Sequence, residues 1–370
     1  MSDQRKGGIA WTDETWNPIR GCSKVSAGCQ HCYAETMAAR FCGPGRPYEG
    51  LIEKGQWNGK VRFVLERLAD PFRWRRPRRI FVNAMSDLFH ESLSFEQIDR
   101  IFGVMAACWD HTFQVLTKRP ARMLEYLNQD RRERWARAGA NGDDAVCDRI
   151  HLGPRALPNV WLGVTVENQA AADERIPLLL QTPAALRWVS MEPLLGPVNL
   201  RHMDVESHSS GWCQIDALTG RHTDMGRPCP NVPRLDWVVG GGESGPKARP
   251  SHPDFFRSLR NQCAEAGVPF LLKQLGEWGP SAVHMTSGEA VYRVFRDFQH
   301  WEAKGYTWMS KGDIVLDALG RRCHTSGDLM DGQAPFTVLR KIGKETSGRL
   351  LDGQLHDAYP ESAERGCACG

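Results

Sequence analysis

The chain has 370 residues, 41% of them hydrophobic and 25% charged, so it is long enough for one large α/β domain or two ordinary ones. Its net charge of +3 is too small to indicate nucleic-acid binding by itself. No apolar run approaches the roughly 20 residues of a membrane helix. The twelve cysteines are unevenly spaced, and the amino terminus lacks a signal-peptide pattern, which favours a reducing compartment. We therefore expect a cytoplasmic protein with no membrane partner.

Short apolar segments alternate with helical segments along most of the chain. The predicted strands are residues 9–12, 79–83, 112–117, 160–165, 186–190, 235–239 and 268–272. The predicted helices are residues 33–40, 61–68, 94–108, 120–127, 169–180 and 253–266, and a turn is expected at 15–18. Strands that alternate with helices imply right-handed βαβ units and a parallel sheet. We predict an α/β fold built on a complete or partial (β/α) barrel, with a doubly wound sheet as the alternative.

Two segments interrupt this alternation, and the pattern changes near residue 280. We predict a barrel over residues 1–280 with insertions near 129–158 and 201–234. A C-terminal appendage is expected over residues 281–370. Its end, which contains the cysteines of residues 367–369, is expected to be disordered.

Three cysteines lie on the loop between the first predicted strand and the first predicted helix. Cys22, Cys29 and Cys32 have the spacing C-x6-C-x2-C, no fourth cysteine follows at matching spacing, and flanking glycines allow tight turns. Three thiolates on a short loop indicate a metal centre. A structural zinc ion takes four ligands, and His31 or Cys42 would complete that set. A [4Fe–4S] cluster with three Cys ligands leaves one iron open to an outside ligand. Both interpretations stay open, as does a set of unrelated buried thiols.

Polar or charged residues follow almost every predicted strand at its carboxyl end. They are Ser86 and Asp87, Lys118, Thr165 with Glu167 and Asn168, Glu192, Glu243 with Ser244, and Lys273 with Gln274. In a (β/α) barrel the chemistry takes place at the carboxyl ends of the strands, on the βα loops. The cysteine loop occupies the equivalent place after the first strand, so we predict that these side chains and the loop share one site.

Three other features are given structural interpretations. Residues 73–79 interleave arginines with Trp74, but they precede a strand and are expected to form a solvated basic surface away from the site. Trp161, Trp188 and Trp237 alternate with apolar strand residues and are expected in the core. The second insertion lacks the paired C-x2-C of a zinc site. A zinc site is nevertheless conceivable there, because the segment contains His202, His208, Cys213, His222 and Cys229.

Several motifs together match a known protein family. They are Trp11-Thr12 with Thr15–Pro18, the cysteine loop Gly21–Ala34, Asn83–Phe89, Val115–Pro120, Leu162–Asn168, Glu192–Gly196, Gly241–Gly245, Lys273-Gln274 and Gly348–Gly353. On these motifs the chain resembles, over nearly its full length, a phage-associated family of proteins of unknown function with radical-SAM-like features. Among radical SAM enzymes it is most similar to spore photoproduct lyase, a DNA-repair enzyme. The commonest cysteine motif of that superfamily is C-x3-C-x2-C, so the x2 pair and the following Tyr33 match, whereas the first gap here is longer.

The resemblance implies a radical SAM enzyme on a partial (β/α), TIM-like barrel of the radical SAM type. Cys22, Cys29 and Cys32 would bind a [4Fe–4S] cluster, and S-adenosylmethionine would chelate its fourth iron. An electron from a flavodoxin- or ferredoxin-like donor would cleave this cofactor to a 5′-deoxyadenosyl radical that abstracts hydrogen from the substrate. The implied substrate is a nucleic-acid base or nucleotide. The alternatives are a zinc-stabilised nucleic-acid-binding protein without redox chemistry and a radical SAM enzyme that acts on a peptide or metabolite.

The resemblance also implies roles for the residues at the strand ends. Ser86 and Asp87 would bind the amino group of S-adenosylmethionine, Lys118 its carboxylate, and Thr165 would add a hydroxyl group. The remaining cofactor-binding residues would be Tyr33 (against the adenine), Glu167, Asn168 and Glu192. The substrate-binding residues would be Glu243, Ser244, Lys273 and Gln274. No catalytic residue is assigned.

Overall fold

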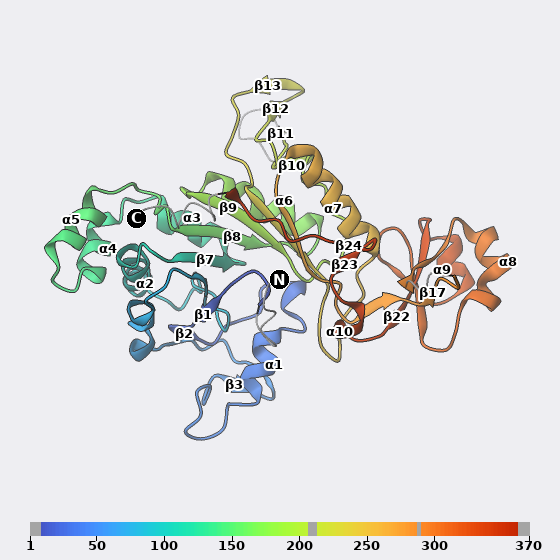
Figure 1. The fold of residues 1–370 in the computed structure, drawn as a ribbon, viewed down its shortest axis with the longest axis horizontal. Coiled ribbons are helices and arrows are strands. Elements are labelled where there is room, and N and C mark those ends of the chain that lie inside the picture. The colour runs from blue at the N-terminus through green and yellow to red at the C-terminus, as the bar shows by residue number, and fades with distance from the viewer. Residues whose placement is uncertain (1–8, 206–212, 287–289, 362–370) are drawn as a thin grey trace.

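Seven parallel strands form the central sheet of the protein (Figure 1). The computed structural model describes residues 9–205, 213–286 and 290–361. In spatial order the strands are β1 (Glu14–Trp16), β6 (Arg79–Val82), β7 (Thr112–Thr117), β8 (Val160–Thr165), β9 (Leu186–Met191), β14 (Trp237–Gly241) and β15 (Phe270–Gln274). Each strand pairs in parallel with its neighbours. The carboxyl ends of all seven strands therefore lie along one edge.

The spatial order of these strands is also their order along the chain. A doubly wound sheet reverses its direction at a switch point, so that alternative is wrong for this protein. The sheet curls, and within the described residues β1 and β15 do not pair with each other, which makes it an open half-barrel. The predicted α/β class is confirmed, and the half-barrel is compatible with the predicted partial (β/α) barrel.

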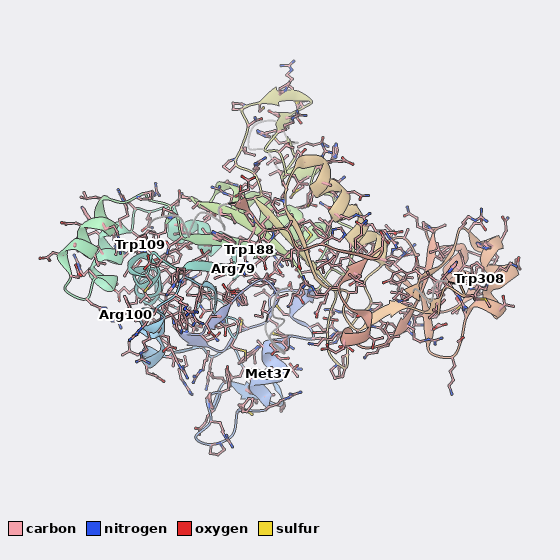
Figure 2. All side chains as sticks on the ribbon, viewed as in Figure 1. Met37, Arg79, Arg100, Trp109, Trp188 and Trp308 are labelled. Atoms are coloured by element: carbon pink, nitrogen blue, oxygen red, sulfur yellow. The ribbon has the colours of Figure 1, made fainter. Side chains whose placement is uncertain are left out.

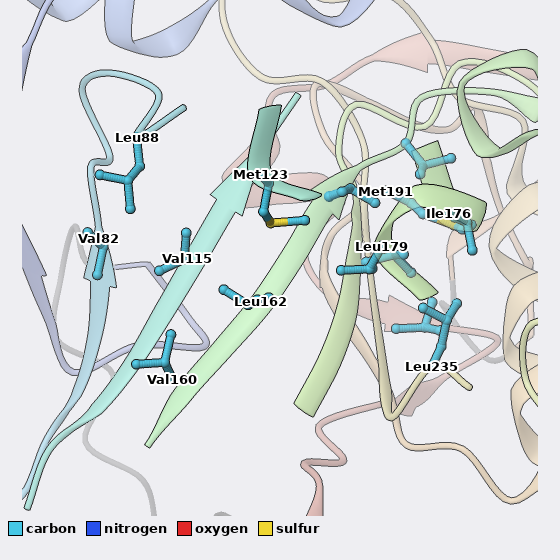
Figure 3. Close-up of a cluster of buried hydrophobic side chains, with 14 of the residues drawn as sticks. Val82, Leu88, Val115, Met123, Val160, Leu162, Ile176, Leu179, Met191 and Leu235 are labelled. Carbon is cyan, nitrogen blue, oxygen red and sulfur yellow. The ribbon is translucent and has the colours of Figure 1, made fainter. Parts of the chain in front are cut away.

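Helices cover one face of the half-barrel. They are α2 (Phe95–Ala107), α3 (Pro120–Leu127), α6 (Gln169–Gln181) and α7 (Pro253–Ala266). Figure 3 shows Val82, Val115 and Leu162 of the sheet in one buried cluster with Met123 and Leu179 of the helices. Burying one such side chain contributes about 1.5–3 kcal/mol, so this layer fixes the helices on the sheet.

Tryptophans fill the centre of the opposite face. Trp161, Trp188 and Trp237 point away from the helix-covered face and are almost completely buried, as predicted. Trp11, before β1, packs on Trp188 with ring centroids 5.1 Å apart, and Tyr359 packs on Trp237 at 5.2 Å. Figure 2 shows Trp188 near the middle of the molecule. Segments from both ends of the described chain thus meet on this face.

Both predicted insertions form structure of their own. The first contains α4 (Arg132–Gly139) and α5 (Asp144–Leu152), and α4 packs against α2. The second forms a four-stranded antiparallel sheet of β10 (Met203–Val205), β11 (Cys213–Ile215), β12 (His222–Asp224) and β13 (Arg227–Cys229). Of the histidines and cysteines considered as zinc ligands in the second insertion, His208 lies outside the described residues.

The chain beyond β15 forms a second antiparallel sheet and then returns to the half-barrel. The sheet consists of β16 (Trp278–Pro280), β22 (Phe336–Lys341), β20 (Asp313–Leu316) and β21 (Arg322–Cys323), with β19 (Arg293–Phe295) also paired to β22. Around it lie α8 (Phe298–Trp308), α9 (Ser326–Met330), β17 (Ala282–Val283) and β18 (Ala290–Val291), with Trp308 at the far end of the molecule from Trp188 (Figure 2). The return segment contains α10 (Lys344–Ser347), β23 (Leu350–Leu351) and β24 (Gln354–Leu355). There the Leu272 amide donates to the His356 carbonyl at 2.9 Å. Residues 367–369, expected to be disordered, lie outside the described residues.

Three local predictions are wrong. The predicted strand at residues 9–12 is a turn, and the strand instead covers Glu14–Trp16, which overlaps the turn predicted at 15–18. Trp16 is buried and pairs with Val82, so tertiary pairing overrides the local turn pattern. Residues 61–68 form β5 (Arg62–Phe63) and a single 3-10 turn rather than a helix, because β5 pairs with β2 (Ile19–Arg20). None of the described helices is both long and apolar enough to cross a membrane.

Candidate functional site

The cysteine loop lies at the carboxyl edge of the half-barrel, where the sequence predicts it. It follows β2 and leads into α1 (Tyr33–Ala39), which is followed by a hairpin of β3 (Ile52–Glu53) and β4 (Gln56–Trp57). Gly21 opens the loop with φ +94° and forms a parallel bridge with Ser86. A side chain at Gly21 would collide with the carbonyl oxygen of Lys60, so glycine is required there on two grounds.

The three thiols of the loop are free and half-buried. The pKa of the Cys22 thiol is raised to about 12, mainly by burial and then by the charge of Asp87. The charges of Cys32 and Cys29 add to this increase, whereas Arg119 opposes it. The three sulfur atoms therefore lie close enough to influence one another electrostatically. Deprotonating Cys22 requires a compensating positive charge, which a bound metal centre supplies.

A single zinc ion and an iron–sulfur cluster make different demands on this loop. Within the described part of the chain, no three His, Cys, Asp or Glu side chains converge closely enough to hold one metal ion. The proposed fourth zinc ligands are engaged elsewhere: His31 contacts Glu243, and the Cys42 thiol donates to the Ala39 carbonyl. A cluster demands less convergence, because each thiolate binds a different iron. The loop is therefore compatible with a cluster.

Asn83, at the same edge of the sheet, has unused hydrogen-bonding capacity. It follows β6 with a left-handed φ of +61°, which is uncommon for a residue other than glycine. Its side chain is buried, and neither its amide nitrogen nor its amide oxygen has a hydrogen-bond partner within the described residues. Such orphaned polar atoms are rare in native proteins. The Asn83 amide therefore offers an unused hydrogen-bond donor and an unused acceptor at this edge of the sheet.

Arg119 connects the first part of the loop to the end of β6. Its guanidinium donates to Asp87 at 3.1 Å and to Glu91 at 2.7 Å. It also donates to the Ser23 hydroxyl at 2.7 Å and to the Ser23 carbonyl at 3.3 Å. Asp87 and Arg119 are both buried. The residue next to Cys22 is thus held by a buried ion pair.

Glu167 connects the middle of the loop to the end of β8. Its carboxylate accepts from the Gly28 amide at 3.2 Å, from Arg175 at 2.9 Å, and from the Ser26 hydroxyl. The side chain is 1% exposed. A Cβ atom on Gly28 would come within 3.2 Å of the Glu167 carboxyl carbon, so glycine allows this close approach. The residue next to Cys29 is held in the same manner.

Glu243 connects the end of the loop to the end of β14. Its carboxylate lies 3.2 Å from Nδ1 of His31 and accepts three hydrogen bonds from Arg249, one from the backbone amide and two from the guanidinium. Arg249 also donates to Gln30 at 3.2 Å. His31 precedes Cys32 directly. We call these three arrangements, Asp87–Arg119, Glu167–Arg175 and Glu243–Arg249, the carboxylate–arginine clamps.

Electrostatics keeps the clamps ionised. Burial raises the pKa of Glu167, but hydrogen bonds from Ser26 and Gly28 and the charge of Arg175 outweigh it, and the net pKa is lowered. For Glu243 too, burial raises the pKa and the Arg249 contacts outweigh it. Both carboxylates are therefore charged acceptors at neutral pH.

Glu192, Lys273 and Gln274 form a separate group that does not contact the loop. The Lys273 ammonium donates to both Glu192 oxygens, at 3.0 and 2.8 Å, and the Gln274 amide donates to Glu192 at 2.9 Å. All three side chains are half-buried, and the side chain of Lys273 is 23% exposed. We call this group the open triad.

The remaining predicted residues are distributed around the same edge. Lys118 is half-buried, and within the described residues its ammonium makes neither a hydrogen bond nor a salt bridge. Thr165 is buried at the end of β8, and Tyr33 is 66% exposed at the start of α1. Asn168 caps α6 by accepting from the Ala171 amide at 3.0 Å, which gives it a structural role. Ser86 donates to the Ile19 carbonyl at 3.1 Å, and Ser244 lies half-buried after β14.

Sequence reasoning did not identify most of the partners that hold the loop. They are Ser23, Ser26, His31, His90, Arg119, Arg175 and Arg249. Arg175 is one of several polar residues on a helix, and Arg249 lies in an irregular segment, so neither shows a local signal. Arg119 directly follows Lys118 at the end of a predicted strand, and this position was the one available clue.

The fold and site define an α/β half-barrel protein with a three-cysteine loop clamped across its carboxyl edge. The family model described as "Protein of unknown function (DUF5131)" matches residues 6–360, and the chain belongs to this family. No curated protein and no solved structure matches the chain.

Proposed function

We propose that the protein is a radical SAM enzyme in which Cys22, Cys29 and Cys32 bind a [4Fe–4S] cluster. The observation that carries this proposal is the loop itself, with three half-buried thiols at the carboxyl edge of a half-barrel and no fourth cysteine in the set. When bound, such a cluster supplies the one-electron reductive cleavage of S-adenosylmethionine, with electrons from a flavodoxin- or ferredoxin-like donor.

Residues around the loop are suited to hold the cofactor. Lys118 offers an ammonium group that is free to bind a carboxylate, and Asn83 offers an amide that both donates and accepts. The role of Asp87 needs revision, because its carboxylate already has four donors. They are the Thr117 hydroxyl, the backbone amides of Lys118 and Phe89, and the Arg119 guanidinium. A cofactor amino group would have to displace one of these donors. We therefore assign the cofactor to Lys118, Asn83 and the open triad rather than to Asp87.

The distribution of charge supports a nucleic-acid base or nucleotide as the substrate. Residues 20–63, which comprise the cysteine loop, α1 and the β3–β4 hairpin, contain seven Lys or Arg and three Asp or Glu. Their net charge of +4 exceeds the +3 of the whole chain. Tyr33 and Phe41 are exposed among these basic residues, at 66% and 42%. Cationic surfaces with exposed aromatic side chains are typical of proteins that bind single-stranded nucleic acid.

The test is anaerobic reconstitution with iron and sulfide, followed by measurement of iron, sulfide and zinc content and of the electron paramagnetic resonance signal with and without S-adenosylmethionine. We expect close to four irons per chain and a signal that changes when the cofactor is added. Cys29→Ala should lose the cluster and the release of 5′-deoxyadenosine, whereas Cys108→Ala, a half-buried thiol at the end of α2, should retain both. A colourless protein that contains one zinc ion and loses it in Cys42→Ala would overturn the proposal in favour of the zinc alternative.

A further inference from the structure

We infer that the three carboxylate–arginine clamps are positioning devices, one for each cysteine, which hold the loop in its binding geometry before any metal arrives. Asp87, Glu167 and Glu243 are the positioning residues. The consequence for cluster retention rests on the proposed function, whereas the ordering of the loop does not.

The contacts assign one clamp to each thiol. Each clamp grips the residue that directly flanks a cysteine in the sequence: Ser23 beside Cys22, Gly28 beside Cys29, and His31 beside Cys32. Glu167 and Glu243 contact the loop themselves. Asp87 holds it indirectly, because it pairs with Arg119, which donates to Ser23.

The loop contacts come from the ends of three strands. Arg119 follows β7 and is joined to β6 through Asp87, whereas Glu167 follows β8. Glu243 follows β14, which β9 separates from β8, so the attachments are spread along the edge of the sheet. Side chains on parallel strands approach one another at the carboxyl edge from fixed positions in the sheet. Three such attachments define both the position and the tilt of a short loop, which two attachments would leave free to rotate.

The unusual length of the first cysteine gap follows from this arrangement. The six residues between Cys22 and Cys29 include Ser23, which contacts the β6 clamp, and Ser26 and Gly28, which contact the β8 clamp. Ser26 also precedes the 3-10 turn Ala27–Cys29, and its carbonyl accepts from the Cys29 amide at 3.0 Å. A three-residue gap has no room for both attachments and the turn. The second gap needs only His31 and Gln30 for the β14 clamp, and it has the usual two residues.

Burial gives the clamps their rigidity. Asp87 and Glu243 are each 6% exposed, and Glu167 is less exposed still. Releasing a loop contact leaves the Glu167 or Glu243 carboxylate short of a donor, or the buried Arg119 guanidinium short of an acceptor, which is unfavourable. In many metal sites, residues that do not bind the metal themselves orient its ligands through hydrogen bonds. The metal-free loop should consequently be ordered.

The experiment compares Glu167→Gln and Glu243→Gln with the wild-type chain in two measurements. Hydrogen–deuterium exchange of the metal-free protein should become at least tenfold faster near residues 26–30 in Glu167→Gln and near 30–33 in Glu243→Gln, with the remaining loop affected less. In reconstituted protein, iron transfer to a chelator should become at least tenfold faster in each variant. If Glu167→Gln does not fold, Gly28→Ala takes its place, because it disturbs the β8 clamp without removing a charge. Gly28→Ala should then show the faster loop exchange and faster iron transfer expected of Glu167→Gln.

Asp99→Asn is the matched control. Asp99 is a buried carboxylate paired with the buried Arg131 and with Tyr126, away from the cysteine loop. It should lower the melting temperature without changing loop exchange or iron transfer. Loop exchange that stays at the wild-type rate in both glutamate variants would overturn the inference, as would equal acceleration in Asp99→Asn. If no variant, wild type included, binds iron, the proposed function fails, and the exchange pattern still decides whether the clamps order the loop.

Discussion

The clamps and the open triad place similar carboxylates at the same edge of the sheet and use them differently. Glu167 is buried, accepts from the loop backbone, and is neutralised by a buried arginine. Glu192, at the end of the neighbouring strand β9, is more exposed and is paired with a lysine and an amide that are themselves half-exposed. The difference indicates that the ends of β6, β7, β8 and β14 support the loop. In the proposed function, β9 and β15 are the strands that present polar groups to a ligand.

Removing the cation from each group should produce the largest contrast. Arg175→Leu leaves the Glu167 carboxylate buried without its main partner, which typically costs about 3–5 kcal/mol. Lys273→Met exposes Glu192 to water and should cost about 1 kcal/mol or less. Urea unfolding of the metal-free proteins measures both free energies. Equal losses would mean that the two regions do not differ in the way we describe.

Lys118→Met should affect binding rather than stability. Within the described residues the Lys118 ammonium makes neither a hydrogen bond nor a salt bridge and only attracts Glu167 through its charge, so its loss should change the melting temperature little. Affinity for S-adenosylmethionine should fall at least tenfold, about 1.4 kcal/mol, as measured by calorimetry on the reconstituted protein. Lys304→Met, on the exposed face of α8, is the control and should bind as wild type. Unchanged affinity in Lys118→Met would remove this lysine from the cofactor site.

Gly28→Ala should have a moderate effect that is specific to the β8 clamp. The new methyl group lies 3.2 Å from the carboxyl carbon of Glu167, so the carboxylate must shift by a few tenths of an ångström. We expect a loss of roughly 1 kcal/mol and a lower melting temperature. Gly43→Ala, where the nearest atom lies at 4.0 Å, should be close to neutral. Similar losses in the two variants would contradict the close approach.

Acidification should release the loop only at low pH. The pKa values of Glu167 and Glu243 are lowered from 4.5 in the folded protein, so their stabilisation is fully present above the unfolded value. It is lost as the pH falls through the lowered folded values. Exchange within the loop, corrected for the intrinsic pH dependence, should therefore be constant from pH 7 to about 5 and rise below about 4.5. A rise already near pH 6 would contradict the assignment of this release to the two glutamates.

The alternation of strands and helices was largely predictable from the sequence, whereas the structure at the two ends of the described chain was not. Val160–Thr165 is an almost continuous apolar run that is buried at every position, as expected for a strand inside a parallel sheet. The strand Glu14–Trp16 has a turn-like sequence, and its pairing with Ile80–Val82 decides its structure. The return of residues 348–360 to the half-barrel depends on long-range contacts, such as the hydrogen bond from the Leu272 amide to the His356 carbonyl. No local sequence pattern predicts these contacts.

The sequence by itself determined that three thiols share one loop and that polar residues follow the strands, because chain order and hydrophobic alternation encode both facts. Only the tertiary structure decided which of these polar residues support the loop and which remain accessible. Arg175 reaches Glu167 from the following helix, and Arg249 reaches Glu243 across an irregular turn. The distinction between clamp and open triad depends on burial and on the direction of side chains, and these are set when the strand ends are brought to one edge.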